Sequence, residues 1–210
     1  MPDKLYSFVM RGELTKISLS NSEAISKHSS SDILTQEYIR SLSLDLLENE
    51  LLNCAKQMAT VYTAIACFEN MVRQFVVKIL IENKGENWWM ESVSEKIRTK
   101  AESRKIEEGK IKWHSPRGDN FINYTEFGDL ASIMSQNLEL FQDHIISLDW
   151  AKQIFTTLER SRNVIMHSGE LGRRDIERIG TNIRDWIVQG VFAWLILPFF
   201  GAMLAVPSGH

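Results

Sequence analysis

The sequence predicts an all-α fold, a bundle of four to five helices followed by an apolar C-terminal segment. Apolar residues recur at three- and four-residue steps over several long segments, which is the spacing of one face of an α-helix. Residues that cap or stop helices stand at the ends of these segments. No segment shows convincing strand alternation, so helices packed on helices are the expected architecture.

The first predicted helix is the longest. Residues 1–42 are expected to be an irregular lead-in, because they are mixed in character and rich in serine. Periodic apolar residues begin near Ser43 and continue to Lys84, with Gly85 as the expected stop. We therefore expect one long amphipathic helix, broken at most once.

The remaining helices follow from the same periodicity. Asn87 and Thr125 stand where the second and third helices begin, and both are expected to be N-caps. The segment 111–125 contains Pro116 and no apolar period, so a loop is expected there. The four predicted helices after the first cover residues 87–110, 125–145, 147–169 and 173–190.

Length, composition and charge limit the classes of function that this chain can have. The chain has 210 residues, 44% hydrophobic residues and a net charge of -3, as expected of one domain with a buried core. Because the chain is slightly acidic overall, any surface for nucleic acid must be local. The N-terminus lacks the apolar stretch of a secretory signal, and Cys54 and Cys67 lie too far apart along one helix for a disulfide. A cytoplasmic protein with two reduced core thiols is expected.

An unusual polar cluster closes the fourth predicted helix. Arg160, Arg162, Asn163 and His167 stand there, with Gly169 directly behind. At about 100° per residue, His167 shares a helix stripe with Arg160 and Asn163, whereas Arg162 lies roughly 140° away. Bases at the end of a helix often only stabilise its dipole and bond its last carbonyls. The alternative is a catalytic site for phosphodiester cleavage.

That alternative has a physical basis. A histidine can move a proton to or from a ribose hydroxyl near neutral pH. An arginine can hold a phosphate while negative charge develops on it, and an asparagine can orient either group. No spacing of histidines, cysteines and acids suggests a metal site, so the expected reaction uses neither a metal nor a cofactor.

The motif resembles that of the HEPN superfamily. The stretch Arg162 to His167 reads "RNVIMH", an R-x4-H pattern late in a helix of an all-α bundle. Stretches 68–89, 124–141 and 158–187 look like successive helices of one bacterial branch of that superfamily. This branch is similar to the C-terminal HEPN domain of a eukaryotic transcript-surveillance endoribonuclease. The resemblance covers residues from about Thr60 to Ile187.

The resemblance implies a function. Catalytic HEPN proteins are metal-independent endoribonucleases, and Arg162, Asn163 and His167 match their motif. Arg160 also satisfies a longer R-x6-H pattern and is expected to support the site. The family pairs two motif helices across a two-fold dimer, so Arg162 need not share a face with its own His167. The resemblance also implies a toxin–antitoxin or anti-phage defence setting, with RNA as substrate and an antitoxin or defence protein as a further partner.

Some HEPN proteins are inactive and bind RNA, nucleotide or protein, so a non-catalytic module stays the alternative function. Glu69 and Arg73, four residues apart in the first helix, are expected to form a surface ion pair or to support the motif helix.

A basic segment is the expected RNA-guiding surface, in which Trp113 and His114 could stack on bases. The alternative is a solvated helix face with ion pairs along it. The basic residues assigned to this surface are Lys96, Arg98, Lys100, Arg104, Lys105, Lys110, Lys112 and Arg117.

The C-terminal end is the second unusual feature. The domain is expected to span residues 43–187 and an apolar tail residues 188–210. The run 186–207 is long and apolar enough for a membrane anchor, and arginines precede it. Pro198 interrupts it, and Trp186 continues an apolar helix stripe, which favours burial in the bundle or in a dimer interface. Both interpretations stay open from the sequence.

Overall fold

A computed structural model of the chain describes residues 36–188. Within this range all regular structure is helical and no strand occurs, so the predicted all-α fold is confirmed for this part of the chain. The chain divides after Cys54 into two compact units. In the first unit, residues 36–41 are helical and a 3-10 turn spans Leu44–Leu46. The structure of the apolar tail predicted for 189–210 lies outside the described residues.

The long first helix is confirmed, although it begins later than predicted. Helix α2 spans Asn49–Lys84, and its buried side chains follow one another at three- and four-residue steps from Met58 to Leu80. Gly85 then takes a φ of +68°, a left-handed conformation that glycine adopts without steric cost. The predicted stop is therefore correct. Cys67 is exposed, so the prediction of a core thiol is wrong at that position.

The second predicted helix is in fact two helices. A 3-10 turn at Gly85–Asn87 leads into α3 (Trp88–Ser92), and α4 (Glu95–Gly109) follows after a break. The break lies at Val93, which has an extended backbone and a side chain only 4% exposed. Asn87 precedes α3 but makes no capping hydrogen bond. Burial of Val93 outweighs the helical preference of its neighbours, which the periodicity alone did not show.

The third predicted helix also breaks. Helix α5 (Phe127–Gln136) is capped by Glu126 through a capping box with Asp129, and not by Thr125. Asn137 separates α5 from α6 (Leu138–Phe141). Its buried side-chain amide donates hydrogen bonds of 2.8 Å to the carbonyl oxygens of Ser92 and Ile133. These bonds satisfy backbone groups at two chain breaks and fix α5 against the end of α3.

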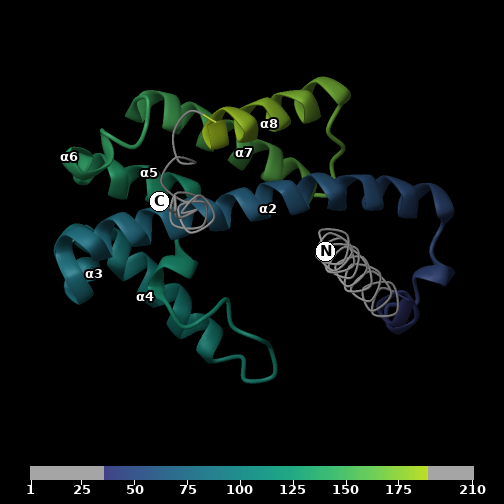
Figure 1. Cartoon of the computed structure of the whole chain (residues 1–210). Coiled ribbons are helices and arrows are strands. Elements are labelled where there is room, and N and C mark those ends of the chain that lie inside the picture. Colours follow the sequence, from purple (N-terminus) through teal and green to yellow (C-terminus); the bar gives the residue numbers. More distant parts are fainter. Residues whose placement is uncertain (1–35, 189–210) are drawn as a thin grey trace, which may run out of the picture. The chain divides into compact units, whose positions relative to one another are not determined.

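Two long helices complete the second unit, as predicted. Helix α7 spans Leu148–Met166, with Ser147 as its N-cap, and α8 spans Arg173–Trp186. Helix α7 packs between α5 and α8, and Figure 1 shows α7 and α8 on the side of α2 opposite α4. Aromatic rings from α2, α5, α7 and α8 meet in the core with centroids 5.3 to 6.3 Å apart; they belong to Phe68, Phe127, Phe155 and Trp186.

Trp186 answers part of the question raised by the C-terminal run. Its side chain is fully buried against Phe68, Phe75 and Trp150, so the start of the run 186–207 belongs to the bundle core. Among the helices of residues 36–188, none combines the length and apolar character that a membrane span requires. Whether the rest of the run crosses a membrane concerns residues outside this range.

Candidate functional site

Beside its buried apolar stripe, α2 has a second face that is mainly polar. Tyr62, Ala66, Glu69, Asn70 and Arg73 follow one another at steps of four, three, one and three residues, so they share one side of the helix. All five line the same pocket. Glu69 is only 6% exposed, which is unusual for a carboxylate without a partner.

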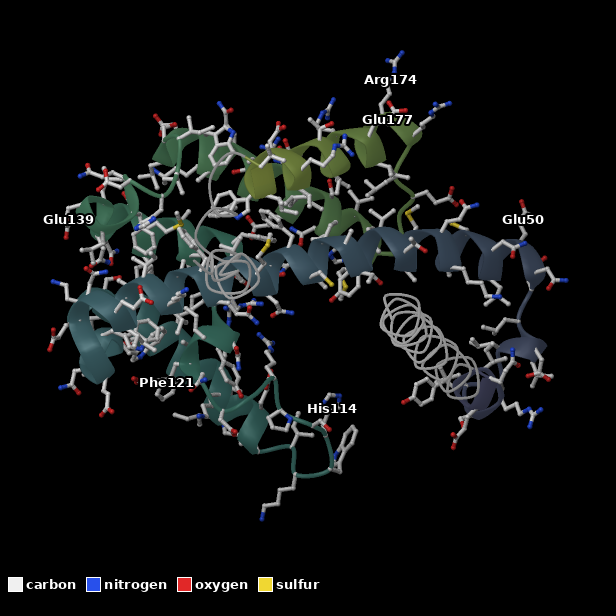
Figure 2. All side chains as sticks on the ribbon, viewed as in Figure 1. Glu50, His114, Phe121, Glu139, Arg174 and Glu177 are labelled. Atoms are coloured by element: carbon white, nitrogen blue, oxygen red, sulfur yellow. The ribbon has the colours of Figure 1, made fainter. Side chains whose placement is uncertain are left out.

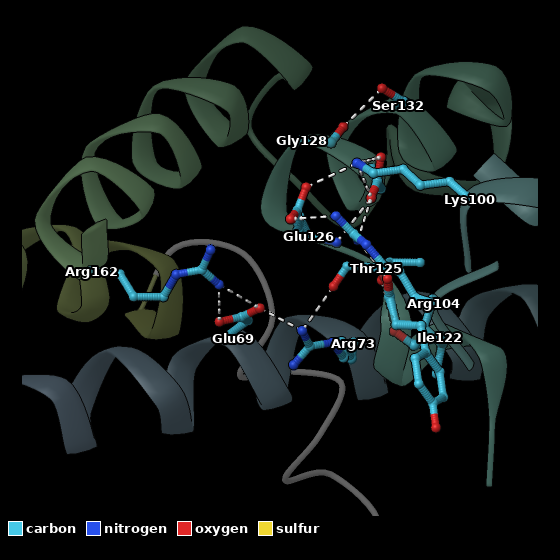
Figure 3. Close-up of polar contacts among 12 residues, drawn as sticks. Glu69, Arg73, Lys100, Arg104, Ile122, Thr125, Glu126, Gly128, Ser132 and Arg162 are labelled. Atoms are coloured by element: carbon cyan, nitrogen blue, oxygen red, sulfur yellow. Dashed lines mark hydrogen bonds and ion pairs between the residues drawn. The ribbon is translucent and has the colours of Figure 1, made fainter. Parts of the chain in front are cut away.

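The partners of Glu69 are two arginines (Figure 3). Arg162 of α7 donates from Nη1 to both carboxylate oxygens, at 3.1 and 3.3 Å. Arg73 forms an ion pair with the same carboxylate, and its Nη2 also donates to the carbonyl oxygen of Thr125 at 2.9 Å. Glu69 therefore joins α2 to the motif helix, the supporting contact that the sequence allowed as one interpretation.

The charges of this cluster do not cancel. Two guanidinium groups share one carboxylate, so the group of three carries a net positive charge. The side chains of Arg73 and Arg162 are 15% and 21% exposed, which weakens the screening of their charge by water. Nε of Arg73 is buried and has no hydrogen-bond partner among residues 36–188. The arrangement favours an anion, because a second negative group would complete the neutralisation.

The cluster forms one wall of a polar pocket with a volume of about 640 Å³. Pockets for small ligands typically measure about 300–1,000 Å³, so this one is large enough for a nucleotide unit. Three arginines and three asparagines face it, from α2, from α7 and from the loop after α4. The lining residues are Tyr62, Ala66, Glu69, Asn70, Arg73, Arg117, Asn123, Thr125, Glu126, Arg162, Asn163 and Met166.

The motif residues do not all reach this pocket. Arg162 and Asn163 line it, whereas His167 and Arg160 do not. His167 is the exposed C-cap of α7, and within residues 36–188 its imidazole has no hydrogen bond or ion pair. Arg160 is exposed as well. The angular separation of Arg162 and His167 expected from helix geometry thus reappears in the folded chain.

Backbone hydrogen bonds and a glycine fix the turn after His167. The backbone N–H of Ser168 donates to Ile165 at 2.9 Å, and that of Gly169 donates to Val164 at 2.8 Å. This is the pattern of a Schellman motif. A Cβ on Gly169 would lie 2.9 Å from the carbonyl oxygen of Val164, so only glycine fits there. The positive φ falls instead on Ser168, at +60°. The turn holds His167 at the helix end and exposed to solvent.

Comparison with known proteins adds no family. None of the family models, curated proteins or solved structures compared with this chain matches it. The relation to HEPN proteins therefore stays an expectation from the motif and the helix pattern. Among residues 36–188, no group of three or more histidines, cysteines and acids is placed to hold a metal ion.

Two residues of the predicted RNA-guiding surface form partly exposed ion pairs with another helix. Lys100 bonds Glu126 at 2.9 Å and Asp129 at 3.1 Å, and Arg104 bonds Glu126 at 2.6 Å (Figure 3). Arg104 also donates to the carbonyl oxygen of Tyr124 at 2.8 Å. These contacts tie α4 to the start of α5. Both residues therefore contribute to the packing of helices, and are not free charges on a solvated face.

The protonation of this network follows from its charges. Burial alone would raise the pKa of Glu126, but the hydrogen bonds and charges of Lys100 and Arg104 outweigh it and leave that pKa below its ordinary value. Burial alone would lower the pKa of Lys100, but Glu126 and Asp129 raise it above its ordinary value. Both shifts favour the ion pair, so the network is charged at neutral pH.

The other basic residues differ in their surroundings. Arg98 donates to the carbonyl oxygen of Met90, and Lys105 to that of Asp119. Lys110 and Arg117 form ion pairs with neighbouring glutamates. Lys96 and Lys112 are exposed and have no ion-pair partner within residues 36–188. Of the whole set, only Arg117 lines the pocket beside Arg162.

The sequence analysis missed several pocket residues. Tyr62 and Asn70 could have been found, because they share a helix face with Glu69 and Arg73. Asn123 and Thr125 could not, because they lie in and after a 3-10 turn within a segment that has no period. Their place in the pocket depends on how the loop after α4 returns to α2.

Proposed function

We propose that this protein is a metal-independent endoribonuclease of HEPN type that acts as a homodimer. The observation that supports it best is the polar pocket beside the motif helix, where Arg162 and Arg73 share one carboxylate and Asn163 lines the wall. The pocket has the size and positive charge that a nucleotide unit requires. His167 stands at the end of the same helix, exposed and without a partner in the described part of the chain.

The chemistry assigns one role to each motif residue. His167 takes the proton from the ribose 2′-hydroxyl, and the oxygen then attacks the adjacent phosphorus. The bond from phosphorus to the 5′-oxygen breaks, and the leaving oxygen receives the proton that His167 took up, which returns the histidine to its neutral form. Arg162 stabilises the negative charge that develops on the phosphoryl oxygens, and Asn163 orients the group. The products are a 2′,3′-cyclic phosphate and a free 5′-hydroxyl.

A second copy of the chain brings the two halves of the site together. His167 does not line the pocket of its own chain, so in the dimer it acts on a phosphate held by Arg162 of the partner. The surface beside the motif supports such a contact, because Val164 and Met166 are 39% and 63% exposed although both are apolar. A toxin–antitoxin or defence setting, with a protein that restrains the nuclease, belongs to the same proposal.

The test is cleavage of total RNA by the purified full-length protein in the presence of EDTA. His167→Ala is expected to lower the rate by about 10²- to 10⁴-fold, the usual contribution of one proton-transfer group. Arg162→Lys keeps a cation for Glu69 but loses the planar guanidinium that can hold a phosphate with two hydrogen bonds, and it is expected to lower the rate as well. Arg178→Ala is the matched control, since its ion pair with Asp175 lies on the surface of α8. Full activity in folded His167→Ala protein would exclude the mechanism.

One observation favours a second function, a non-catalytic module that binds RNA, nucleotide or a protein partner. Arg162 is already held by Glu69, and no histidine among residues 36–188 lines the pocket of a single chain. Such a pocket could bind a nucleotide without cleaving anything. Binding of RNA by wild-type protein that yields no cyclic phosphate ends, at any protein concentration that permits dimerisation, would favour the module.

A further inference from the structure

The loop between α4 and the 3-10 turn at Phe121–Tyr124 presents an aromatic side chain to solvent. Trp113 is 86% exposed, more than any other large apolar side chain within residues 36–188. Figure 2 shows its neighbour His114 where this loop projects from the helices of the second unit. Ile111, two residues before it, and Ile106 of α4 are 46% and 63% exposed. Single exposed apolar side chains are ordinary on a protein surface, so the exposure of Trp113 has meaning only together with the charge of its loop.

Hydrogen bonds and an ion pair fix the end of the loop that follows Trp113. The backbone N–H of Arg117 donates to Glu108 at 3.1 Å, and the two side chains form an ion pair. The hydroxyl of Tyr124 donates to the carbonyl oxygen of Gly118 at 3.1 Å. The ring of Trp113 contacts that of His114 edge-on, with centroids 5.7 Å apart. The loop is thus fixed at its ends, while Trp113 between them is 86% exposed.

The charge of the loop indicates what it contacts. Residues 110–118 contain Lys110, Lys112 and Arg117 and no acidic residue. Lys110 and Arg117 each pair with a glutamate of α4, whereas Lys112 is exposed next to Trp113 and has no ion-pair partner in the described range. An exposed aromatic face beside a free cation is the combination with which proteins bind single-stranded nucleic acid.

The loop is continuous with the candidate site. Arg117, at its base, lines the same pocket as Arg162 and Asn163. Asn123, shortly after the loop, lines it as well. A strand that places a phosphate in the pocket therefore passes the base of the loop.

We propose that Trp113 is a stacking platform for an unpaired base of the RNA strand whose phosphate occupies the pocket, with Lys112 contacting the backbone beside it. The inference rests on the proposed function and adds a positioning residue outside the motif. Base stacking on an aromatic side chain tolerates any base, so Trp113 selects unpaired strands over duplexes and not one sequence over another.

The test is binding of a fluorescent, mixed-sequence single strand of about ten nucleotides, within the usual span of such sites. Full-length His167→Ala protein is used so that the strand is not cleaved. Trp113→Ala is expected to weaken binding by about 5- to 150-fold, the loss typical of one stacked base, and Trp113→Phe to recover most of it. The loss of affinity in Trp113→Ala should be equal at low and high salt. Lys112→Ala, in contrast, should reduce the slope of log binding constant against log salt concentration by roughly 0.7. Unchanged melting temperatures show that the variants remain folded.

A spectroscopic readout identifies the partner directly. The chain has six tryptophans, so 5-fluorotryptophan labelling gives six fluorine resonances, and Trp113→Phe assigns one of them. That resonance is expected to shift with the single strand and to stay in place with the duplex form or with phosphatidylglycerol vesicles. A shift with vesicles alone would assign the loop to a membrane and overturn the inference.

The possible results distinguish a failure of the inference about Trp113 from a failure of the proposed nuclease function. If wild-type protein cleaves RNA while Trp113→Ala binds the strand as tightly as its parent, the inference is wrong and the proposed function stands. If binding depends on Trp113 but no RNA is ever cleaved, the inference stands and the nuclease does not. If wild-type protein neither binds nor cleaves RNA, both fall.

Discussion

Removing the charge of Glu69 tests the central claim about the site, that this one carboxylate organises two arginines from different helices. Glu69→Gln keeps the shape of the side chain and one acceptor oxygen but leaves Arg73 and Arg162 facing each other without a shared anion. Removing one partner of a buried ion pair costs about 3–5 kcal/mol. Arg73 and Arg162 keep 15% and 21% of their surface exposed and the amide still accepts one bond, so we expect a loss of about 2–4 kcal/mol in the free energy of unfolding.

The comparison variant is Arg162→Gln, which leaves Glu69 bound to Arg73. Its expected loss is smaller, about 1–2 kcal/mol, because only a hydrogen-bonded charge contact disappears and no buried anion is left unpaired. Urea unfolding followed by circular dichroism gives both values on the same scale. For a domain of this size, the Glu69→Gln loss corresponds to a fall in melting temperature of about 4–16 °C.

The test depends on which of the two variants loses more free energy of unfolding. If Glu69→Gln costs less than about 0.5 kcal/mol, the change resembles an ordinary surface substitution and the buried cluster does not exist in solution. Equal losses in both variants would mean that Arg73 does not share the carboxylate. Either result would also remove the geometric basis for a phosphate site at Arg162.

The remaining predictions concern the network, the turn and the tail. The pKa of Glu126 is lowered in the folded protein, so its pair with Lys100 stabilises the fold above the unfolded-state pKa of about 4.3. This stability is lost as pH falls through the folded-state pKa. Acid unfolding of Glu126→Gln should therefore depend less on pH than acid unfolding of the wild type. Ser168→Gly should raise the free energy of unfolding by about 0.5–1 kcal/mol, because glycine takes the left-handed φ of +60° without strain, and unchanged or lower stability in urea unfolding would count against the turn. Deleting residues 190–210 should disrupt dimerisation or solubility more than it releases a membrane protein; resistance of the full chain to carbonate extraction, with a soluble and active deletion dimer, would show an anchor instead.

Periodicity predicted the fold where one helix face is continuously apolar. Helices α2, α7 and α8 follow such stripes over 36, 19 and 14 residues, and no local signal competes with them. It did not predict the breaks at Val93 and Asn137. Each break depends on a tertiary contact: Val93 is buried, and the side chain of Asn137 bonds two carbonyl oxygens of which one lies 45 residues away. A window of sequence cannot contain that information.

The site shows the same division. The motif helix and the pair of Glu69 and Arg73 could be read from spacing, because each lies within one helix. The contact between Glu69 and Arg162, which are 93 residues apart, could not be predicted from spacing. Nor could the engagement of Lys100 and Arg104 with Glu126, which depends on how α4 packs beside the start of α5. Basic residues near one another in sequence were therefore assigned to one surface, although they divide into groups with different roles.

This division decides how the proposed RNA path should be probed. Reversing the charges of Lys100 and Arg104 would break the contacts between α4 and α5, so lost RNA binding in such a variant would report unfolding as much as recognition. Lys96 and Lys112 are exposed and have no ion-pair partner within the described residues, so their substitution changes the surface charge alone. If RNA follows the projecting loop, Lys112→Ala weakens binding with a reduced salt slope, while Lys96→Ala, away from the loop on α4, does not. Equal effects of the two substitutions would indicate a diffuse positive field in place of a defined path.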